Sequence, residues 1–333
     1  MAKGKAVVCG GGGFIGGHLV EDLLKKGFEV RCVDVKPKEN WYQVHKGAEN
    51  VVADLNLKEA AFAAVKGCDQ VFNLACNMGG MGFIENNKGL CMISVLINTH
   101  LLLGAREQGG VKRFFYASSA CVYNGEKQTS KSTDVFLKEE DAYPALPEDG
   151  YGWEKLFSER MCRHFREDWK VPTRVARFHN VYGPFGTYEG GREKAPAAIC
   201  RKVIEAKNSG KHEIEIWGDG KQTRSFMYVT DCLKGIYMIA EHESFFEPVN
   251  LGSSEGVTIN RLVDIVEEIA GIKLKRNYNL NAPKGVNGRN SDNTLIKSVF
   301  NWEPDTKLRD GMEKTYRWIH DQMMSKGAKK KSA

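Results

Sequence analysis

Short apolar runs rich in β-branched and aromatic residues alternate with longer amphipathic segments through the first half of the chain. The runs predict six buried strands, and the stretches at 18–26 and 90–108 predict helices closed by glycine. Strands separated by helical segments require crossover connections, which favour a parallel sheet with helices on both faces. The predicted strands are residues 6–9, 29–33, 50–53, 70–74, 113–117 and 175–178.

A glycine-rich turn joins the first predicted strand to the first predicted helix. Gly10, Gly13 and Gly16 form a G-x-x-G-x-x-G pattern. In such a pattern glycine allows the tight turn, the approach of a pyrophosphate, and close packing of helix on strand. The phosphates are then expected on the free N–H groups of the helix N-terminus, beside Phe14 and Ile15. The context between strand and helix makes this pattern a specific sign of a dinucleotide site.

An acidic residue, Asp34, follows the second predicted strand. Its carboxylate can accept hydrogen bonds from both hydroxyls of the adenine-side ribose and repels a 2′-phosphate, so NAD is expected rather than NADP. The alternative is a loop aspartate that caps a turn. Asp54 and Leu55, after the third predicted strand, are expected at the adenine end of the cofactor.

The composition of the chain changes after about residue 180, where glycine and proline become more frequent. Short helices are expected at 259–270 and 308–323. We therefore predict an α/β protein with a doubly wound, Rossmann-type NAD-binding domain at 1–178. A smaller, mixed α/β substrate-binding domain is predicted at 179–325, and some of its segments return to the first domain. A basic tail at 326–333 is expected to be disordered.

Composition adds few constraints. Of the 333 residues, 42% are hydrophobic and 27% are charged, as in globular proteins, and no apolar stretch approaches the ~20 residues that span a bilayer. The nine cysteines form no Cys-x-x-Cys pair, so no metal site is expected. Neither nucleic acid nor membrane is an expected partner, and the expected location is cytoplasmic. Four of the net +6 charges come from the tail residues Lys326, Lys329, Lys330 and Lys331.

Tyr151 and Lys155 are four residues apart and fall on one face of a predicted helix. The lysine ammonium is expected to lower the pKa of the phenol, so that the phenolate can take a proton from a sugar hydroxyl while a hydride leaves for NAD. The alternative is an exposed surface pair. A serine-rich strand end at 118–123, which contains Ser119, makes the pattern more specific.

On these motifs the chain resembles the extended short-chain dehydrogenase/reductase family over nearly its whole length. The resemblance implies that Ser119, Tyr151 and Lys155 form the catalytic set, with Lys155 also holding the nicotinamide ribose. Members commonly oxidise a nucleotide sugar at C4, act on the ketone and reduce it again with the same cofactor. They are usually homodimers whose long helices pair, and the apolar face at 90–103 suits such pairing. The alternative is that this face packs only on its own sheet.

Ala120 and Cys121 follow the serine, at positions where dehydratases of this family carry an Asp-Glu pair. Without that acid, elimination of water lacks its proton donor. A ketone at C4 acidifies the protons on C3 and C5, and inverting a carbon requires an acid/base group on each face of the sugar. Cys121 and Lys194 are the candidates. The alternatives are a small core residue for Cys121 and a solvent-facing loop lysine for Lys194.

Longer strings of the chain resemble the family of GDP-mannose 3,5-epimerases. These strings are residues 78–84, 177–187, 190–198, 217–220, 222–226 and 288–293. The resemblance implies that Cys121 and Lys194 are the acid/base pair and that Arg224 and Arg289 suit the diphosphate, since a guanidinium binds phosphate as a fork. It places around the GDP-sugar Gly79, Ser119, Ala120, Cys121, Asn180, Lys194, Lys202, Gln222, Arg224 and Arg289.

The expected reaction is NAD-dependent epimerisation of GDP-mannose at C3 and C5 to GDP-L-galactose, with GDP-L-gulose as the product of inversion at C5 alone. It proceeds through transient oxidation at C4, an enolate and re-reduction. One alternative is another nucleotide-sugar epimerase of the same family, such as a 4-epimerase. An alternative of another class is a non-catalytic NAD-binding sensor or scaffold.

Overall fold

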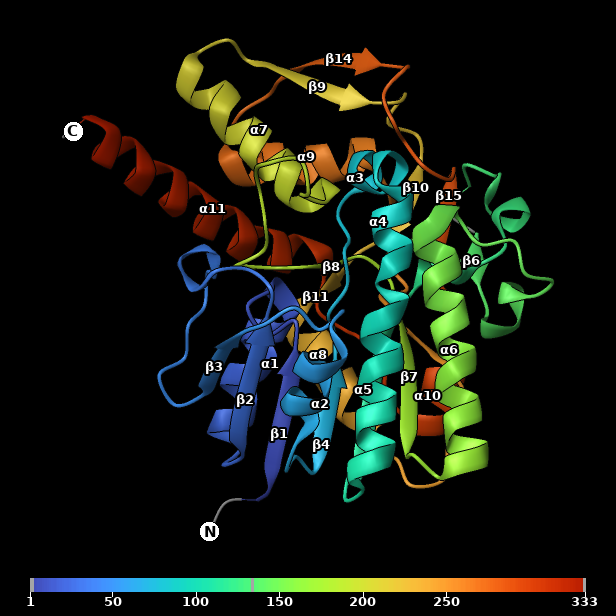
Figure 1. Cartoon of the computed structure of the whole chain (residues 1–333). Helices are drawn as coiled ribbons and strands as arrows, with labels where there is room; N and C mark the ends of the chain where they lie inside the picture. The colour runs from blue at the N-terminus through green and yellow to red at the C-terminus, as the bar shows by residue number, and fades with distance from the viewer. Residues whose placement is uncertain (1–2, 133–134, 332–333) are drawn as a thin grey trace.

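The computed structural model describes residues 3–132 and 135–331. Its centre is a seven-stranded parallel sheet in the order β12-β7-β5-β4-β1-β2-β3, which confirms the predicted doubly wound α/β fold (Figure 1). Six strands are the predicted ones, and β12 is a seventh that the hydrophobic pattern did not single out. The strands are β1 (Lys5–Cys9), β2 (Glu29–Asp34), β3 (Glu49–Val52), β4 (Gln70–Asn73), β5 (Arg113–Ser119), β7 (Thr173–Phe178) and β12 (Val249–Leu251).

Helices cover both faces of this sheet because successive side chains of a strand point to opposite sides. Val8 packs in the cluster that contains residues of α1 and α8, whereas its neighbour Val7 packs with residues of α2, α5 and α6. The bounds of these helices are α1 (Phe14–Lys25), α2 (Lys58–Val65), α5 (Val95–Gln108), α6 (Asp149–Trp169) and α8 (Val229–Glu241).

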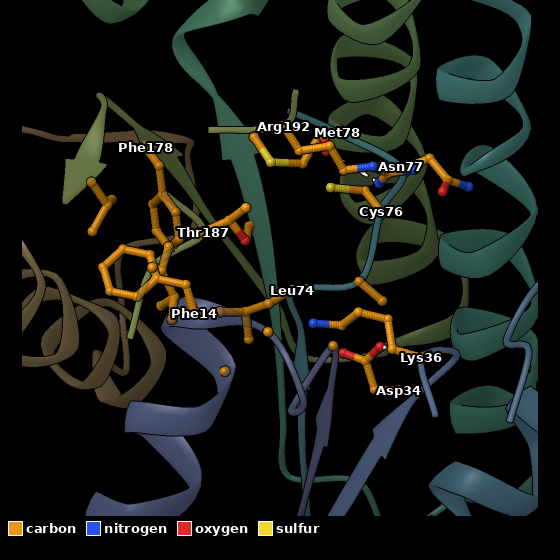
Figure 2. A pocket seen from close by; sticks show the side chains of 18 of the residues that line it. Phe14, Asp34, Lys36, Leu74, Cys76, Asn77, Met78, Phe178, Thr187 and Arg192 are labelled. Atoms are coloured by element: carbon orange, nitrogen blue, oxygen red, sulfur yellow. Dashed lines mark hydrogen bonds between the residues drawn. The ribbon is translucent and has the colours of Figure 1, made fainter. Parts of the chain in front are cut away.

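The strand order reverses between β1 and β4. The connections that follow these two strands run in opposite directions, which opens a crevice at the carboxyl ends of the strands. A cavity of about 350 Å³ lies there. Figure 2 shows Asp34 and Lys36 at one end of it and Cys76 and Met78 at the other, with Phe14 of α1 on the near side. The fold therefore positions one elongated site across the sheet edge.

The second part of the molecule lies above this edge (Figure 1). Its strands form small sheets in the orders β13-β10-β15-β6, β11-β8 and β14-β9. These strands are β6 (Phe136–Leu137), β8 (Val181–Tyr182), β9 (Glu213–Trp217), β10 (Thr223–Ser225), β11 (Met227–Tyr228), β13 (Gly256–Thr258), β14 (Lys275–Asn279) and β15 (Gly288–Ser291). The helices of this part are α3 (Met81–Asn86), α4 (Lys88–Ile93), α7 (Ala195–Ser209), α9 (Ile259–Ala270) and α11 (Leu308–Lys331). Helix α10 (Thr294–Phe300) lies lower, against β12 of the central sheet. Short 3-10 turns lie at η1 (Lys38–Asn40), η2 (Ala120–Val122), η3 (Gly125–Gln128) and η4 (Glu139–Ala142).

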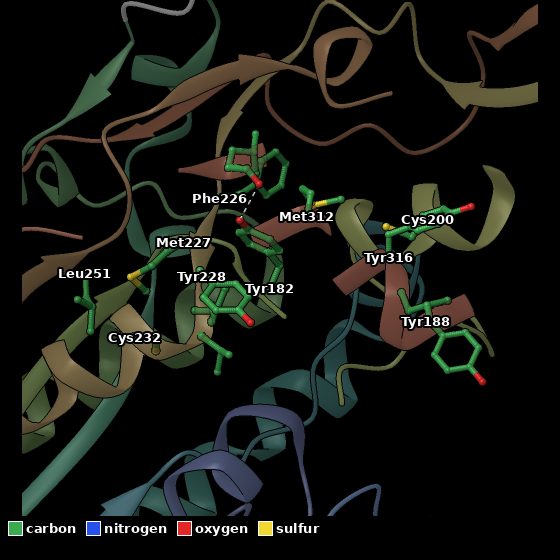
Figure 3. Packing of buried hydrophobic residues seen from close by; sticks show 14 of the residues in the cluster. Tyr182, Tyr188, Cys200, Phe226, Met227, Tyr228, Cys232, Leu251, Met312 and Tyr316 are labelled. Atoms are coloured by element: carbon green, nitrogen blue, oxygen red, sulfur yellow. Dashed lines mark hydrogen bonds between the residues drawn. The ribbon is translucent and has the colours of Figure 1, made fainter. Parts of the chain in front are cut away.

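The two parts share one hydrophobic core. Tyr182 of β8 and Tyr228 of β11 pack near Met312 and Tyr316 of α11 (Figure 3), and the same cluster includes Val8 of the central sheet. The hydroxyl of Tyr182 donates to the carbonyl of Leu308 at 3.1 Å. The second part thus packs directly on the first, as the lack of a long linker implied.

Three details differ from the sequence-based expectations. The helix expected at 90–108 is two helices, α4 and α5, and α11 continues through Lys331 into the tail for which disorder was predicted. The segment Lys88–Gln108 is also long and apolar enough to cross a membrane by length and composition alone, which contradicts the expectation that no such stretch exists. A helix in the core of a soluble protein passes the same test, and 44% of the apolar window is buried inside this chain.

The predicted division of the chain at residue 179 is not a clean spatial one. Strand β12 pairs with β7, and α8 packs against the same sheet, although both come from the second half of the sequence. The division of the chain into two domains stays a prediction.

Candidate active site

The glycine turn has the close contacts that its sequence predicts. Gly10 has a φ of +82°, and a Cβ on Gly16 would lie 2.2 Å from the carbonyl oxygen of Gly10. Only glycine at position 16 therefore lets the first turn of α1 approach the strand so closely. Among the described residues, no side chain caps the N-terminus of α1 at Gly13. Its N–H groups thus suit an anionic ligand such as a pyrophosphate.

Asp34 lies at the end of β2, is 7% exposed, and lines the cavity. Its Oδ1 accepts a hydrogen bond from the backbone N–H of Lys36 at 3.0 Å. The Asp34 side chain thus caps a turn and also lines the cavity. Capping of a turn and contact with the ribose, the two alternatives for this residue, are therefore compatible. Asp54 and Leu55 line the same end. Together with the uncapped helix, this acidic end fits the ribose and phosphates of a dinucleotide.

The cavity brings together most of the residues that were predicted for cofactor binding and redox chemistry. Those that line it are Gly10, Gly13, Phe14, Ile15, Gly16, Asp34, Asp54, Leu55, Ser119, Tyr151 and Lys194. Lys155 is 2% exposed and lies behind this surface. The other predicted substrate residues are not part of the cavity lining, and they are Gly79, Ala120, Cys121, Asn180, Lys202, Gln222, Arg224 and Arg289.

Tyr151 and Lys155 lie one turn apart on α6, as predicted. The Lys155 Nζ is 5.7 Å from the centroid of the Tyr151 ring and donates to the carbonyl of Ala117 at 3.0 Å. The Ser119 hydroxyl lies near the Tyr151 phenol and favours its ionised form. Strand β5 and helix α6 therefore hold the three predicted redox residues together at one end of the cavity.

The phenol of Tyr151 is deeply buried in the folded chain. Burial raises the pKa of Tyr151 well above its ordinary value, and the nearby thiols of Cys76 and Cys121 act in the same direction. The expected lowering of the phenol pKa by the Lys155 ammonium stays a prediction.

Two residues beside this pair were missed by the sequence analysis. Cys76 follows β4, lines the cavity, and lies near enough to Tyr151 and Lys155 to raise the pKa of both. The Glu154 carboxylate is buried, with Oε2 3.7 Å from the Lys155 Nζ. Burial works against the charge of Lys155, yet Cys76 and Glu154 raise the pKa of this lysine. Neither Cys76 nor Glu154 belongs to a sequence motif that predicts a catalytic role. Each reaches the site only because β4 and α6 pack together.

Cys121 and Lys194 approach the redox residues from different elements. Cys121 lies in η2, and its backbone N–H donates to the Ser119 Oγ at 3.2 Å. Lys194 is the N-cap of α7 and lines the cavity. Burial lowers the pKa of Lys194, which agrees with the expected desolvation of this amine, and the proximity of Cys121 opposes the shift. A thiol and an amine whose pKa is lowered by burial therefore lie beside the same end of the cavity as Tyr151.

Two glycine-containing loops meet over this end. The N–H of Gly80 donates to the carbonyl of Arg192 at 3.1 Å, and the Arg192 guanidinium lies 3.9 Å from the centroid of the Phe83 ring. A Cβ on Gly79 would lie 2.8 Å from the Phe83 Cβ and 3.2 Å from the Arg192 Cα. Gly79 is thus required for the loops to pack, and its predicted contact with the sugar stays a prediction.

Two arginines lie next to each other on neighbouring strands, where Arg224 of β10 pairs in register with Arg289 of β15. Burial, together with Arg289, lowers the pKa of Arg224 to about 10. Arg289 donates to Gln128, to the Cys121 thiol and to the Glu148 carboxylate. Its guanidinium therefore has protein partners beside Cys121, a contact that the sequence analysis did not anticipate.

The remaining predicted substrate residues form a separate group. Gln222 donates to the carbonyl of Trp217 at 2.8 Å, and its buried Oε1 has no hydrogen-bond partner among the described residues. Lys202 donates to the carbonyl of Glu215 at 3.0 Å and lies 5.7 Å from the centroid of the Trp217 ring. Asn180, with a φ of +40°, donates to the carbonyl of Ser225 at 3.1 Å.

Several characterised proteins are similar to this chain. The chain is 44% identical over 316 residues to GDP-mannose 3,5-epimerase 1 of Oryza sativa subsp. japonica, which covers 95% of this chain and 82% of the relative. It is 43% identical over 325 residues to GDP-mannose 3,5-epimerase of Arabidopsis thaliana, which covers 98% and 84%, respectively.

Solved structures agree in fold. UDP-glucose 4-epimerase of Thermotoga maritima, with UDP-glucose, matches with a TM-score of 0.83 at 24% identity and covers 96% of this chain and 99% of its own. MoeE5 in complex with UDP-glucose and NAD matches with a TM-score of 0.79 at 28% identity and covers 96% and 100%. The model of the NAD dependent epimerase/dehydratase family matches residues 6–252. The chain belongs to this family, and its cofactor is NAD.

Proposed function

We propose that this enzyme inverts C3 and C5 of GDP-mannose. The observation that carries the proposal is the presence of Cys121 and Lys194 beside the Tyr151 end of the NAD cavity. A 4-epimerase needs no such additional pair, because only C4 changes. The GDP-mannose 3,5-epimerases of rice and Arabidopsis are 44% and 43% identical to the chain over most of its length, which supports the same substrate.

Tyr151 takes the proton of the C4 hydroxyl in the first stage and returns it in the last. When bound, NAD accepts a hydride from the sugar and later gives it back. The Ser119 hydroxyl is proposed to hold the oxygen at C4, since it lines the same cavity as the nearby phenol of Tyr151. Lys155 keeps a positive charge near the phenolate that forms, because Cys76 and Glu154 favour its ammonium form against the effect of burial.

Cys121 and Lys194 act in the second stage, on the ketone. The protons on C3 and C5 are acidic only while the C4 ketone exists, because each carbanion is delocalised as an enolate. One group removes a proton from one face of the ring and the other returns a proton to the opposite face. The lowered pKa of Lys194 increases its neutral fraction, and a neutral amine is the form that can remove a proton.

Arg224 and Arg289 are proposed to bind the diphosphate of GDP. They lie side by side on β10 and β15, and the Glu148 carboxylate pairs with Arg289. Arg224 donates to the backbone carbonyls of residues 223, 284 and 286, which carry no formal charge. One carboxylate beside two guanidinium groups leaves an excess positive charge, which suits a diphosphate. The contacts of Gly79, Asn180, Lys202 and Gln222 with the GDP-sugar are part of the same proposal.

Incubation of the enzyme with GDP-mannose in D₂O tests the proposed reaction. NMR is expected to detect deuterium at C3 and C5 and sugar products inverted at these carbons, without net formation of reduced nicotinamide, because the same hydride returns to C4. A 4-epimerase would instead convert UDP-glucose, the matched control substrate, and would incorporate no solvent deuterium because C4 receives its hydrogen from the cofactor. GDP-mannose recovered unchanged and without deuterium would contradict the proposal and favour the sensor or scaffold.

We also propose that the enzyme is a cytoplasmic homodimer. All nine cysteines lie among the described residues and are free, as expected in a reducing compartment. Helices α4 and α5 follow each other end to end and run alongside α6 (Figure 1). Together the three helices carry several exposed apolar side chains. These are Leu90, Met92, Ile93, Leu96, Trp153 and Phe157, each 40–58% exposed. A second copy placed on this face would bury them in a bundle of paired helices.

Leu96→Glu is expected to dissociate the dimer, because it buries a charge in the centre of the paired helices. A loss of about 2 kcal/mol or more corresponds to a dissociation constant at least about 30-fold higher. Sedimentation at micromolar concentration measures the mass of each variant. Leu280→Glu is the matched control, since Leu280 is 67% exposed and lies outside this face. A wild-type protein that is monomeric under these conditions would contradict the proposal.

A further inference from the structure

Two glycines at the start of α1 lie outside the dinucleotide pattern. The G-x-x-G-x-x-G pattern does not include Gly12 or Gly17. A Cβ on Gly12 would lie 2.4 Å from the ring of Trp41, which is buried in the core. A Cβ on Gly17 would lie 2.7 Å from the side chain of Gln43. Side chains of the segment that follows β2 therefore occupy the space that larger residues at these two positions would need.

This segment, residues 36–45, forms a strap over the start of α1. The Lys36 Nζ donates to the carbonyl of Gly12 at 2.8 Å, and the Trp41 Nε1 donates to the carbonyl of Lys36, also at 2.8 Å. At the other end of the strap, the His45 ring donates to a carbonyl in the first turn of α1 at 3.0 Å. The strap is thus fixed by hydrogen bonds at both ends and by the Trp41 ring between them.

The strap also joins two segments that line the acidic end of the cavity. The glycine turn contributes Gly13 to this lining, and the end of β2 with the residues after it contributes Asp34 and Lys36 (Figure 2). The backbone N–H of Lys36 donates to the Asp34 carboxylate, while its side chain reaches the Gly12 carbonyl on the opposite segment. The two segments can therefore separate only if the hydrogen bond between Lys36 and Gly12 breaks.

Tyr42 anchors the outer side of the strap on α11. The centroid of its ring lies 5.4 Å from that of Trp318, and Trp318 lies 5.2 Å from the ring of Phe185. Phe185 has a φ of +65°, which a bulky side chain rarely adopts, so these ring contacts hold a strained residue in place. The chain continues from Phe185 to Lys194. One aromatic cluster thus connects the strap, the C-terminal helix and the segment that leads to the acid/base lysine.

We propose that the strap retains NAD in the enzyme during turnover, with Lys36 and Trp41 as its positioning residues. The inference rests on the proposed function, because a hydride returns to the same sugar only if the cofactor stays bound between oxidation and reduction. The strap holds the N–H groups at the start of α1 in the geometry that suits a pyrophosphate. It also keeps the two segments of the acidic end together, so that little ordering remains for the moment of binding.

The rate at which the holoenzyme releases NADH tests the strap without any sugar. Bound NADH is followed by its fluorescence while excess NAD replaces each molecule that dissociates. Gly12→Ala places a methyl group where the Trp41 ring lies and is expected to displace the strap. Lys36→Met removes the hydrogen bond to the Gly12 carbonyl and keeps an unbranched side chain. Release is expected to be about tenfold faster in each variant, the effect of one hydrogen bond to a charged group.

Gly47→Ala is the matched control, since Gly47 follows the strap and a Cβ there would lie 3.5 Å from Leu24, an ordinary contact. Its release rate is expected to equal that of the wild type. In a Trp41→Ala background, Gly12→Ala is expected to add no further acceleration, because its methyl group then meets no ring. A purely structural role of the strap would instead lower the melting temperature and leave the release rate of the folded protein unchanged.

The outcomes separate the strap from the proposed reaction. Release at the wild-type rate in folded Gly12→Ala and Lys36→Met overturns retention by the strap, whatever the sugar substrate is. If Gly12→Ala does not fold, Lys36→Met decides alone, since Lys36 is only half-buried. Faster release in the variants, combined with a wild-type enzyme that leaves GDP-mannose unchanged, supports the strap and contradicts the proposed function.

Discussion

Tyr151→Phe is expected to abolish both the oxidation at C4 and the later exchange at C3 and C5. The phenol is the group beside Ser119 that can take the C4 hydroxyl proton, and without its oxygen no ketone forms. The C3 and C5 protons then stay unactivated although Cys121 and Lys194 are intact. Loss of a positioned proton acceptor costs about 10²–10⁴-fold in rate, or about 3–5 kcal/mol in activation free energy. Product formation and deuterium uptake are expected to fall together by this factor.

The measurement for Tyr151→Phe is a time course by NMR in D₂O, with the absorbance of reduced nicotinamide followed in parallel. Tyr143→Phe is the matched control, because Tyr143 is 45% exposed and makes no contribution to the cavity. Deuterium at C3 or C5 in the Tyr151 variant at the wild-type rate would mean that enolate formation does not need this tyrosine. The order of the two stages would then be wrong.

The central sheet could be predicted because its strands are apolar runs interrupted by helices and by a glycine turn. Position 16 illustrates why such a local pattern is informative: its glycine is required by a contact within the same turn, with the Gly10 carbonyl. The small sheet that carries Arg224 and Arg289 was not predictable in the same way. Its strands have two to four residues, too few to show a period, and β6 pairs with a strand more than 150 residues away.

The site was predictable where a motif carries the chemistry. Tyr151 and Lys155 are one turn apart in any helix, and Asp34 ends a strand that the apolar pattern already defines. Cys76 and Glu154 had no such signal, since their importance comes from what packs against them. The electrostatics were also beyond the sequence, because the pKa of Tyr151 depends on how deeply the folded chain buries the phenol. Spacing shows which groups share a helix face, whereas burial decides their charge.

Cys121→Ala and Lys194→Ala are each expected to separate oxidation from epimerisation. Neither change touches Tyr151, so C4 is still oxidised, and the enzyme is expected to accumulate reduced nicotinamide and a 4-keto sugar. Epimerised product is expected to fall by about 10²–10⁴-fold, the usual cost of removing a positioned acid or base. Absorbance of the reduced nicotinamide in a single turnover measures the first effect, and NMR of the sugar measures the second.

The isotope pattern distinguishes the two groups. If Lys194 is the proton acceptor and Cys121 the donor, Cys121→Ala still removes protons, and deuterium returns to the original face through Lys194. Its GDP-mannose is then deuterated without inversion, whereas Lys194→Ala takes up little deuterium at either carbon. Cys68→Ala and Lys207→Ala are matched controls, since neither side chain lines the cavity. Cys68 packs in the core and contacts Ala64 and Arg31, and Lys207 donates to the carbonyl of Ala270. Undiminished turnover of Cys121→Ala with deuterium at both carbons would make Cys121 a packing residue, and the paired acid/base mechanism would fail with it.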